Sequence, residues 1–322
     1  MKDYIPKIGY YQREFKLLRR DNKKGGAPHK PILLLSIIEA YENGIINDEK
    51  IFIKPELVQN FRRIWAELVD TDHHAIFALP FYHMKSESFW KLLPNLGYEK
   101  VIASRASLKG SFNTLNEAVN HAKIESDLKN LFLNEETRVL LKSTLLDHFF
   151  PNTKEFYQKS TNIDKSFLYD QDDTYFKKLN HLKENLDENS FQEDLFVRSG
   201  IFKREIPKIY NFTCAISKMK ISTITGASLV DACHIIPFSV SQDDTISNGI
   251  SLCPNLHRAF DRGLIFIDEN YKVRLNNNFT DNLKSSYNIQ QFEGERIMLP
   301  ENPNYRPKVE NLIRHKTSFY KT

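Results

Sequence analysis

The segment Asp231-Ala232-Cys233-His234-Ile235-Ile236-Pro237 decides how the C-terminal part of this chain folds. It is followed by Asn248-Gly249 and then by Asn255-Leu256-His257-Arg258-Ala259-Phe260-Asp261. The apolar run before Pro237 predicts a strand, Asn-Gly predicts a turn, and the run around His257 predicts a short helix. A histidine, an asparagine and a second histidine in this order suit a strand, a loop and a helix folded around one metal ion.

These residue types suit hydrolysis of a phosphodiester bond near neutral pH. His234 can act as the base, because an imidazole titrates close to that pH. Asn248 can orient the base by hydrogen bonding. His257 and Asp261 lie four residues apart, so on a helix both side chains face one direction and can share a divalent ion. The predicted catalytic residues are therefore His234, Asn248 and His257.

Two arginines, Arg258 and Arg262, flank these residues and could hold phosphate oxygens. Each feature also has a simpler explanation when it is taken alone. The histidine before Pro237 could be a packed or surface residue, Asn-Gly is commonly only a turn, and a His–Asp pair four residues apart is common on helix surfaces. The ordered combination of all three favours a nuclease.

Residues 211–275 resemble the HNH (ββα-metal) nuclease family, in the branch written Ala-x-His-Ile-x-Pro, Asn-Gly-x-x-Leu and His-x-x-Phe-Asp-x-Gly. The resemblance implies that His234 is the general base, Asn248 the middle asparagine and His257 a metal ligand. It also implies that Asp261 is a second ligand or a helix-stabilising partner of His257.

The metal ligands of this branch lead to a definite expectation. Many relatives carry an acidic residue or a histidine directly before the base, where this chain has Cys233, and Asp231 on the same strand face could substitute. We therefore expect His257, Asp261 and Asp231 to hold a divalent metal, with Mg²⁺ as the expected ion and Mn²⁺ or a similar ion as the alternative.

A structural zinc site is not expected. Other relatives carry two Cys-x-x-Cys knuckles for zinc, but the corresponding segments here, beginning at Cys214 and Cys253, each lack the second thiol. These two cysteines are predicted to be buried small apolar residues.

Helical spacing dominates the N-terminal half. Pro31 and Asn43-Gly44 bracket a predicted buried helix, Pro55 opens a second one, and further helices are predicted over 115–132 and 135–149. We expect an α+β chain with a mostly helical DNA-reading domain at 1–150, a polar linker at 151–195 and a ββα-metal HNH nuclease domain at 196–322.

Two stretches of the N-terminal half, Ala27-Pro28-His29-Lys30-Pro31 and 78–90, resemble the sulfur-binding domain of phosphorothioate-dependent restriction endonucleases. A backbone sulfur is larger and more weakly hydrated than the oxygen that it replaces, so an apolar cup beside basic residues would favour it. The predicted DNA-contacting residues here are His29, Lys30, Leu79, Pro80, Phe81, His83 and Lys85. Reading of a modified base or of plain sequence is the alternative, and these residues could also serve only the core.

Composition sets the wider limits. The 322 residues are 41% hydrophobic and 27% charged, with a net charge of +4, which is compatible with a polyanionic partner but does not identify one. Three cysteines and an N-terminus without an apolar signal segment lead us to expect a cytoplasmic protein with no membrane span.

The sequence thus predicts a restriction-type endonuclease that acts on double-stranded DNA, possibly backbone-modified, and possibly works as a homodimer. A DNA-binding protein with a decayed catalytic unit, a toxin-type nuclease and an unrelated α+β protein are the rival interpretations. Metal-dependent cleavage separates the first rival from the main prediction.

Overall fold

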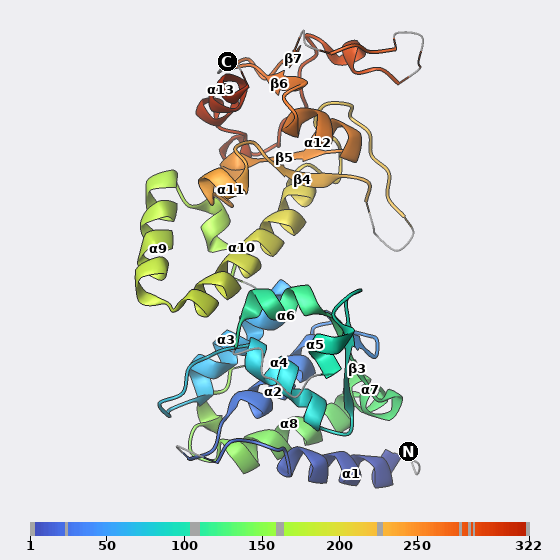
Figure 1. Ribbon diagram of the computed structural model, residues 1–322, viewed down its shortest axis with the longest axis vertical. Coiled ribbons are helices and arrows are strands. Elements are labelled where there is room, and N and C mark those ends of the chain that lie inside the picture. The colour runs from blue at the N-terminus through green and yellow to red at the C-terminus, as the bar shows by residue number, and fades with distance from the viewer. Residues whose placement is uncertain are drawn as a thin grey trace. The chain divides into compact units, whose positions relative to one another are not determined.

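The computed structural model describes residues 4–22, 25–103, 110–158, 164–223, 228–276, 279–282, 285 and 287–319. The chain divides into two compact units (Figure 1). The first comprises Met1–Ile163 and Lys183–Val197, and the second comprises Asp164–Leu182 and Arg198–Thr322. Two of the three points at which the chain passes between the units fall inside helices, at 182/183 in α9 (Asp172–Asn185) and at 197/198 in α10 (Glu188–Ile209).

The first unit is built from helices and a small antiparallel sheet (Figure 1). Its elements before α9, in chain order, are α1 (Tyr4–Lys16), α2 (His29–Glu42), β1 (Lys50–Ile51), α3 (Pro55–Leu68), α4 (Ala78–His83), η2 (Met84–Ser86), β2 (Trp90–Pro94), α5 (Glu99–Ala103), α6 (Phe112–Ala118), β3 (Val119–Ile124), α7 (Ser126–Leu133), α8 (Glu135–Phe149) and η3 (Lys154–Phe156).

Helix α2 lies at the centre of this unit. Its side chains from Lys30 to Tyr41 are buried all round, and it packs against α3, α4, α7 and α8. A helix that is apolar on every side must be enclosed by other elements. The predicted helix after Pro31 is confirmed, and it ends where Asn43 and then Gly44, at a φ of +68°, turn the chain.

The sheet has the strand order β1-β3-β2, with both pairs antiparallel. Its central strand, β3, lies inside the segment 115–132, which the spacing of apolar residues predicts as one helix. That prediction is wrong, because β3 is hydrogen-bonded along both edges and buries most of its side chains. Sheet pairing and burial outweigh the local preference of the segment.

The second unit contains the predicted ββα arrangement. After α10, its elements are β4 (Asp231–His234), α11 (Phe238–Ser241), η5 (Ile246–Asn248), β5 (Gly249–Leu252), α12 (Pro254–Asp261), β6 (Ile265–Ile267), β7 (Val273–Leu275), η6 (Ile289–Phe292), η7 (Pro303–Tyr305) and α13 (Val309–Ser318), with η4 (Ser166–Tyr169) preceding α9. Strands β4 and β5 form one hairpin and β6 and β7 another. The predicted α+β class is confirmed.

Gly249 lets helix α10 lie directly on the β4–β5 hairpin. It stands opposite His234 in the hairpin register. A Cβ atom at this position would lie 2.9 Å from Cγ1 of Ile206 and 3.0 Å from Cε2 of Phe202. One face of the hairpin is therefore covered by α10.

Helix α12 presents its polar side to β4 because its apolar side is fixed elsewhere. Pro254 occupies the first turn, where its missing N–H costs nothing, and Leu256 and Phe260 are buried. The ring of Phe260 stacks on His315 of α13 at a centroid distance of 3.7 Å. These contacts set the rotation of α12 about its axis.

The segment 151–195 contains η3, η4, α9 and the first part of α10, and its residues contribute to both units. The division into a reading domain, a linker and a nuclease domain at 150 and 195 stays a prediction. No helix among the described residues is both long enough and apolar enough to cross a bilayer.

Candidate metal and catalytic site

Strand β4 presents different chemistry on its two faces. Side chains alternate along a strand, so Asp231 and Cys233 share one face and His234 takes the other. The first face meets α12, and the second meets α10. Cys233 is fully buried, whereas the side chain of Asp231 is 54% exposed.

Helix α12 supplies two further polar groups to the Cys233 face. His257 and Asp261 lie one turn apart, and Nε2 of His257 is 3.4 Å from Oδ2 of Asp261. The predicted helix that places these two residues on one side is confirmed. The side chain of His257 is 25% exposed and that of Asp261 is 52% exposed, so this end of the group opens to solvent.

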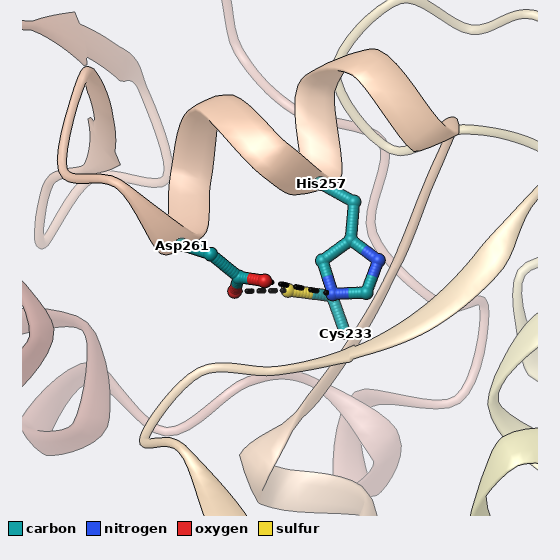
Figure 2. A group of neighbouring side chains, drawn as sticks. All are labelled: Cys233, His257 and Asp261. Atoms are coloured by element: carbon teal, nitrogen blue, oxygen red, sulfur yellow. Dashed lines mark hydrogen bonds and ion pairs between the residues drawn. The ribbon is translucent and has the colours of Figure 1, made fainter.

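Cys233, His257 and Asp261 form a cluster with the character of a metal site. One sulfur, one nitrogen and one oxygen atom from these residues lie within 4.8 Å of one another. Sγ of Cys233 lies 3.8 Å from Oδ1 of Asp261. Figure 2 shows the three side chains pointing toward one another, one from β4 and two from α12. The residues present therefore fit a divalent cation.

The charge balance of the cluster also favours a cation. Burial raises the pKa of the Cys233 thiol well above its usual value, and the carboxylates of Asp261 and Asp231 act in the same direction. Without a positive charge nearby the sulfur stays protonated. Metal ligands of this type lose their protons as a cation binds.

Asp231 lies on the outer side of His257. Its Oδ2 atom is 3.6 Å from Nδ1 of His257, whereas Asp261 faces Nε2 of the same ring. The two carboxylates therefore flank opposite nitrogens of one imidazole. Of the three predicted ligands, the structure brings His257 and Asp261 to one point and places Asp231 behind the ring.

His234 is held by a different set of contacts. Its Nε2 atom is 2.9 Å from Oδ1 of Asp244, which is fully buried. The imidazole stacks on Phe202 of α10 at a centroid distance of 4.0 Å and an angle of 7°, and Phe238 packs against it at 5.7 Å. Burial raises the pKa of Asp244, and the hydrogen bond to His234 partly opposes this shift.

No contact described in the structure joins the His234 ring to the cluster at Cys233. The two residues are nevertheless consecutive, so their Cα atoms are separated by only about 3.8 Å.

Asn248 organises the loop between β4 and β5. Its side chain is fully buried, donates to the carbonyls of Ile236 and Asp243 at 3.0 Å each, and accepts from the Ile236 N–H at 2.8 Å. The Asp243 carbonyl that Asn248 holds belongs to the residue directly before Asp244, which bonds His234. Asn248 thus acts on the loop backbone, and Asp244 makes the hydrogen bond to the ring that was predicted for Asn248.

Asp244 and Cys233 are the residues that sequence reasoning missed. The acidic pair Asp243-Asp244, lying between the two halves of the motif, was a usable signal for a partner of the histidine. Cys233, directly before His234 where many relatives carry a ligand, was a second usable signal. Arg258 and Arg262, which follow His257 and Asp261 directly in the chain, are exposed, as their predicted contact with phosphate requires.

The first unit contains a cavity of about 800 Å³ between α2 and α4. It is lined mostly by apolar surface and by six of the seven residues predicted to contact DNA, namely His29, Lys30, Leu79, Pro80, His83 and Lys85. Phe81 does not line it. Its ring is fully buried and packs between Phe77 and Trp90.

Neither Lys30 nor His29 adds an uncompensated positive charge to this cavity. Lys30 is buried, and its ammonium pairs with Glu87 and donates to Ser86 at 2.8 Å. Burial lowers the pKa of His29 to about 4, so its ring is neutral near pH 7. Arg19, which also lines the cavity, is exposed and offers charge at its edge.

Comparison with known proteins adds independent findings. Residues 214–268 match the HNH endonuclease family. No curated protein matches the chain. A solved structure of a modification-dependent TagI restriction endonuclease shares 21% identity over 38% of each chain, with a TM-score of 0.29. The phosphorothioation-dependent restriction endonuclease ScoMcrA shares 10% identity over 77% of this chain and 94% of its own, with a TM-score of 0.31.

Proposed function

We propose that this chain is a metal-dependent endonuclease that cuts DNA carrying a backbone modification, because residues 214–268 match the HNH endonuclease family. The observation that carries the catalytic part is the convergence of Cys233, His257 and Asp261 beside the His234–Asp244 pair. The observation that carries the selective part is the cavity between α2 and α4.

His234 acts as the general base in this proposal. Asp244 accepts the Nε2–H proton in a hydrogen bond, which leaves the lone pair of Nδ1 to take a proton from water. The water oxygen then attacks phosphorus in line with the departing 3′ oxygen. Phe202, stacked on the ring, and Asp244 keep the imidazole from rotating.

The cluster beside β4 would hold the metal through His257 and Asp261, with Asp231 on the other side of the imidazole. A divalent ion here supplies positive charge to the phosphate and to the departing oxygen. Mg²⁺, the usual ion of oxygen-rich sites, and its common substitute Mn²⁺ are the first ions to test. Arg258 and Arg262 would hold neighbouring phosphate oxygens.

The catalytic proposal is tested by nicking of a plasmid or duplex in the presence of a divalent ion. His234→Ala should abolish cleavage with DNA binding retained, and Asp244→Asn should lower the rate, by about 100-fold or more if the base loses its orientation. His257→Ala should remove both cleavage and the response to metal. Full activity of His234→Ala would refute the assigned base.

The cavity between α2 and α4 would read the modification. Leu79 and Pro80 contribute apolar surface, which suits a weakly hydrated backbone sulfur better than a phosphate oxygen. Lys85 and Arg19 place positive charge near it for the adjacent phosphates. His29 and His83 line the same wall and would contribute polar contacts.

The selective proposal is tested with matched duplexes that differ only in one phosphorothioate linkage. Tighter binding and faster cutting of the modified duplex support sulfur recognition, whereas equal behaviour of both rejects it. The cavity volume of about 800 Å³ would also admit a nucleobase turned out of the helix, so duplexes with modified bases form the second arm. If no duplex is cut with any metal, the chain is a DNA-binding protein with an inactive HNH unit.

One catalytic unit per chain cuts one strand. Cleavage of both strands of double-stranded DNA would then require two copies of the chain, and we propose a homodimer on the DNA. Light scattering of the protein with and without a duplex tests this stoichiometry.

A further inference from the structure

We infer that Cys233 supplies a thiolate to the metal site, and that the site therefore selects a zinc-like ion over Mg²⁺. The inference rests on the proposed function, because it concerns the ion that the HNH unit would hold. It differs from the expectation of Mg²⁺ that oxygen ligands alone would support.

The sulfur is placed as a ligand. Sγ of Cys233 lies with a ring nitrogen of His257 and a carboxylate oxygen of Asp261 inside a group whose members are all within 4.8 Å of one another. Cys233 is fully buried and forms the floor of the group, whereas Asp261 is half exposed at its open side. Three donors with one open side leave room for water or a phosphate oxygen, which is the arrangement of catalytic zinc sites.

The donor set decides which ion fits. Mg²⁺ requires hard oxygen ligands in near-octahedral geometry and keeps several of its waters. Sulfur and imidazole nitrogen instead suit Zn²⁺ and chemically similar ions such as Co²⁺. Two of the three donors, Cys233 and His257, are therefore poor ligands for Mg²⁺. The third, Asp261, suits either class.

Asp231 has the position of an orienting residue. Its carboxylate faces Nδ1 of His257, while Nε2 faces Asp261 in the cluster. A carboxylate behind a metal-bound imidazole fixes the ring orientation and leaves the other nitrogen unprotonated for the metal. Asp231 then acts through His257 and does not itself bind the ion.

A buried cysteine is also a common small apolar residue. A packing role and a ligand role predict different results for Cys233→Ser, which keeps the size of the side chain nearly unchanged. A purely packing role leaves metal affinity as it was. A ligand role changes both the affinity and the spectrum of the bound metal.

Cobalt is the probe, because a Co²⁺–thiolate bond gives a near-ultraviolet charge-transfer band that Co²⁺ bound by nitrogen and oxygen lacks. The full chain, stripped of metal, is titrated with Co²⁺. We expect the thiolate band to appear, to be displaced by Zn²⁺ at equal concentration and to survive a large excess of Mg²⁺. Cys233→Ser should remove the band and weaken binding by about tenfold or more.

Control variants make the result specific. His257→Ala should also remove the band, which covers the case that Cys233→Ser does not fold. Cys253→Ser changes another buried thiol outside the cluster and should keep it. Asp231→Asn should weaken Co²⁺ binding by about 10-fold with the band retained, because the orientation of the ring is loosened and no ligand is lost.

The outcomes separate the inference from the proposed function. Co²⁺ binding without the band, or a band that survives in Cys233→Ser, overturns the thiolate assignment even if DNA is cut. Displacement of Co²⁺ by Mg²⁺ as readily as by Zn²⁺ overturns the selectivity. A thiolate band that depends on Cys233, in a protein that cuts no duplex with any ion, upholds the inference and refutes the nuclease proposal.

Discussion

Replacing Gly249 by alanine tests the link between packing and catalysis most directly. The backbone at Gly249 is extended, with a φ of −118° and a ψ of 142°, so alanine introduces no backbone strain. On backbone grounds alone the change would be neutral or slightly stabilising, by less than about 1 kcal/mol. Any larger loss must come from contacts of the new methyl group.

Those contacts are too close to be tolerated without movement. The added carbon would lie 2.9 Å from Cγ1 of Ile206, nearer still to its terminal methyl, and 3.0 Å from Cε2 of Phe202. Ordinary carbon–carbon contacts are about 3.5–4.0 Å, so α10 has to retreat by about 0.5–1 Å. Overpacking of this kind costs about 1–3 kcal/mol.

The movement would reach His234, the proposed base, because Phe202 stacks on its ring at a centroid distance of 4.0 Å. A displacement of 1 Å in a catalytic group can lower the rate by about 100-fold. We therefore expect Gly249→Ala to slow nicking by about 10-fold or more, while Co²⁺ affinity stays near that of the wild type. Cys233 points to the other face of β4 and does not feel the change directly.

The assay combines a urea midpoint, a nicking rate and a Co²⁺ titration. Ile206→Ala removes the closest atoms, so the double variant should lose less stability than the sum of the two single variants, with a coupling of about 0.5–3 kcal/mol. Gly9→Ala in helix α1, where the new methyl meets nothing within 4 Å, is the control for an added methyl without a clash and should stabilise by about 0.5–1 kcal/mol. If Gly249→Ala keeps wild-type stability and rate, the argument from α10 to His234 fails.

Four further substitutions give separate predictions. Asn248→Ala should cost about 2–4 kcal/mol, because three buried backbone groups lose their partner, and a urea midpoint checks it. Burial raises the pKa of Glu193 to about 8. The folded state then holds a proton that the unfolded state releases near pH 4.5, so the free energy of unfolding should fall as pH rises from about 5 to 8. Thermal melts at several pH values check this, because Glu193→Gln should flatten the slope. Lys30→Met should cost about 3–5 kcal/mol by leaving Glu87 buried without its partner, and adding Glu87→Leu should recover most of the loss. Arg19→Ala, by contrast, should weaken DNA binding in a salt titration without changing the melting temperature, and an unchanged salt slope would contradict its contact with phosphate.

The parts of the fold that the sequence predicted are those governed by local signals. The helix after Pro31 is apolar throughout and bracketed by chain breakers, so its limits were readable. The ββα order followed from Pro237, from Asn248-Gly249 and from the four-residue spacing of His257 and Asp261. In each case the determining residues lie close together in the chain.

The parts that were missed depend on distant partners. Strand β3 carries apolar residues at a spacing that also suits a helix, and only its pairing with β1 and β2 makes it a strand. The role of Cys233 depends on which side of α12 faces β4, and that is set by the stack of Phe260 on His315. Asp244 reaches His234 only because Asn248 folds the loop between them.

The alternation of side chains along β4 has a consequence for engineering this chain. Inserting or deleting a single residue ahead of Cys233 would exchange the two sides of the strand, turning the sulfur toward α10 and the imidazole toward α12. No single substitution could return both the sulfur and the imidazole to their own faces after such a shift of register. Variation of this chain should therefore proceed by substitution within a hairpin of constant length, and length changes belong in segments outside it.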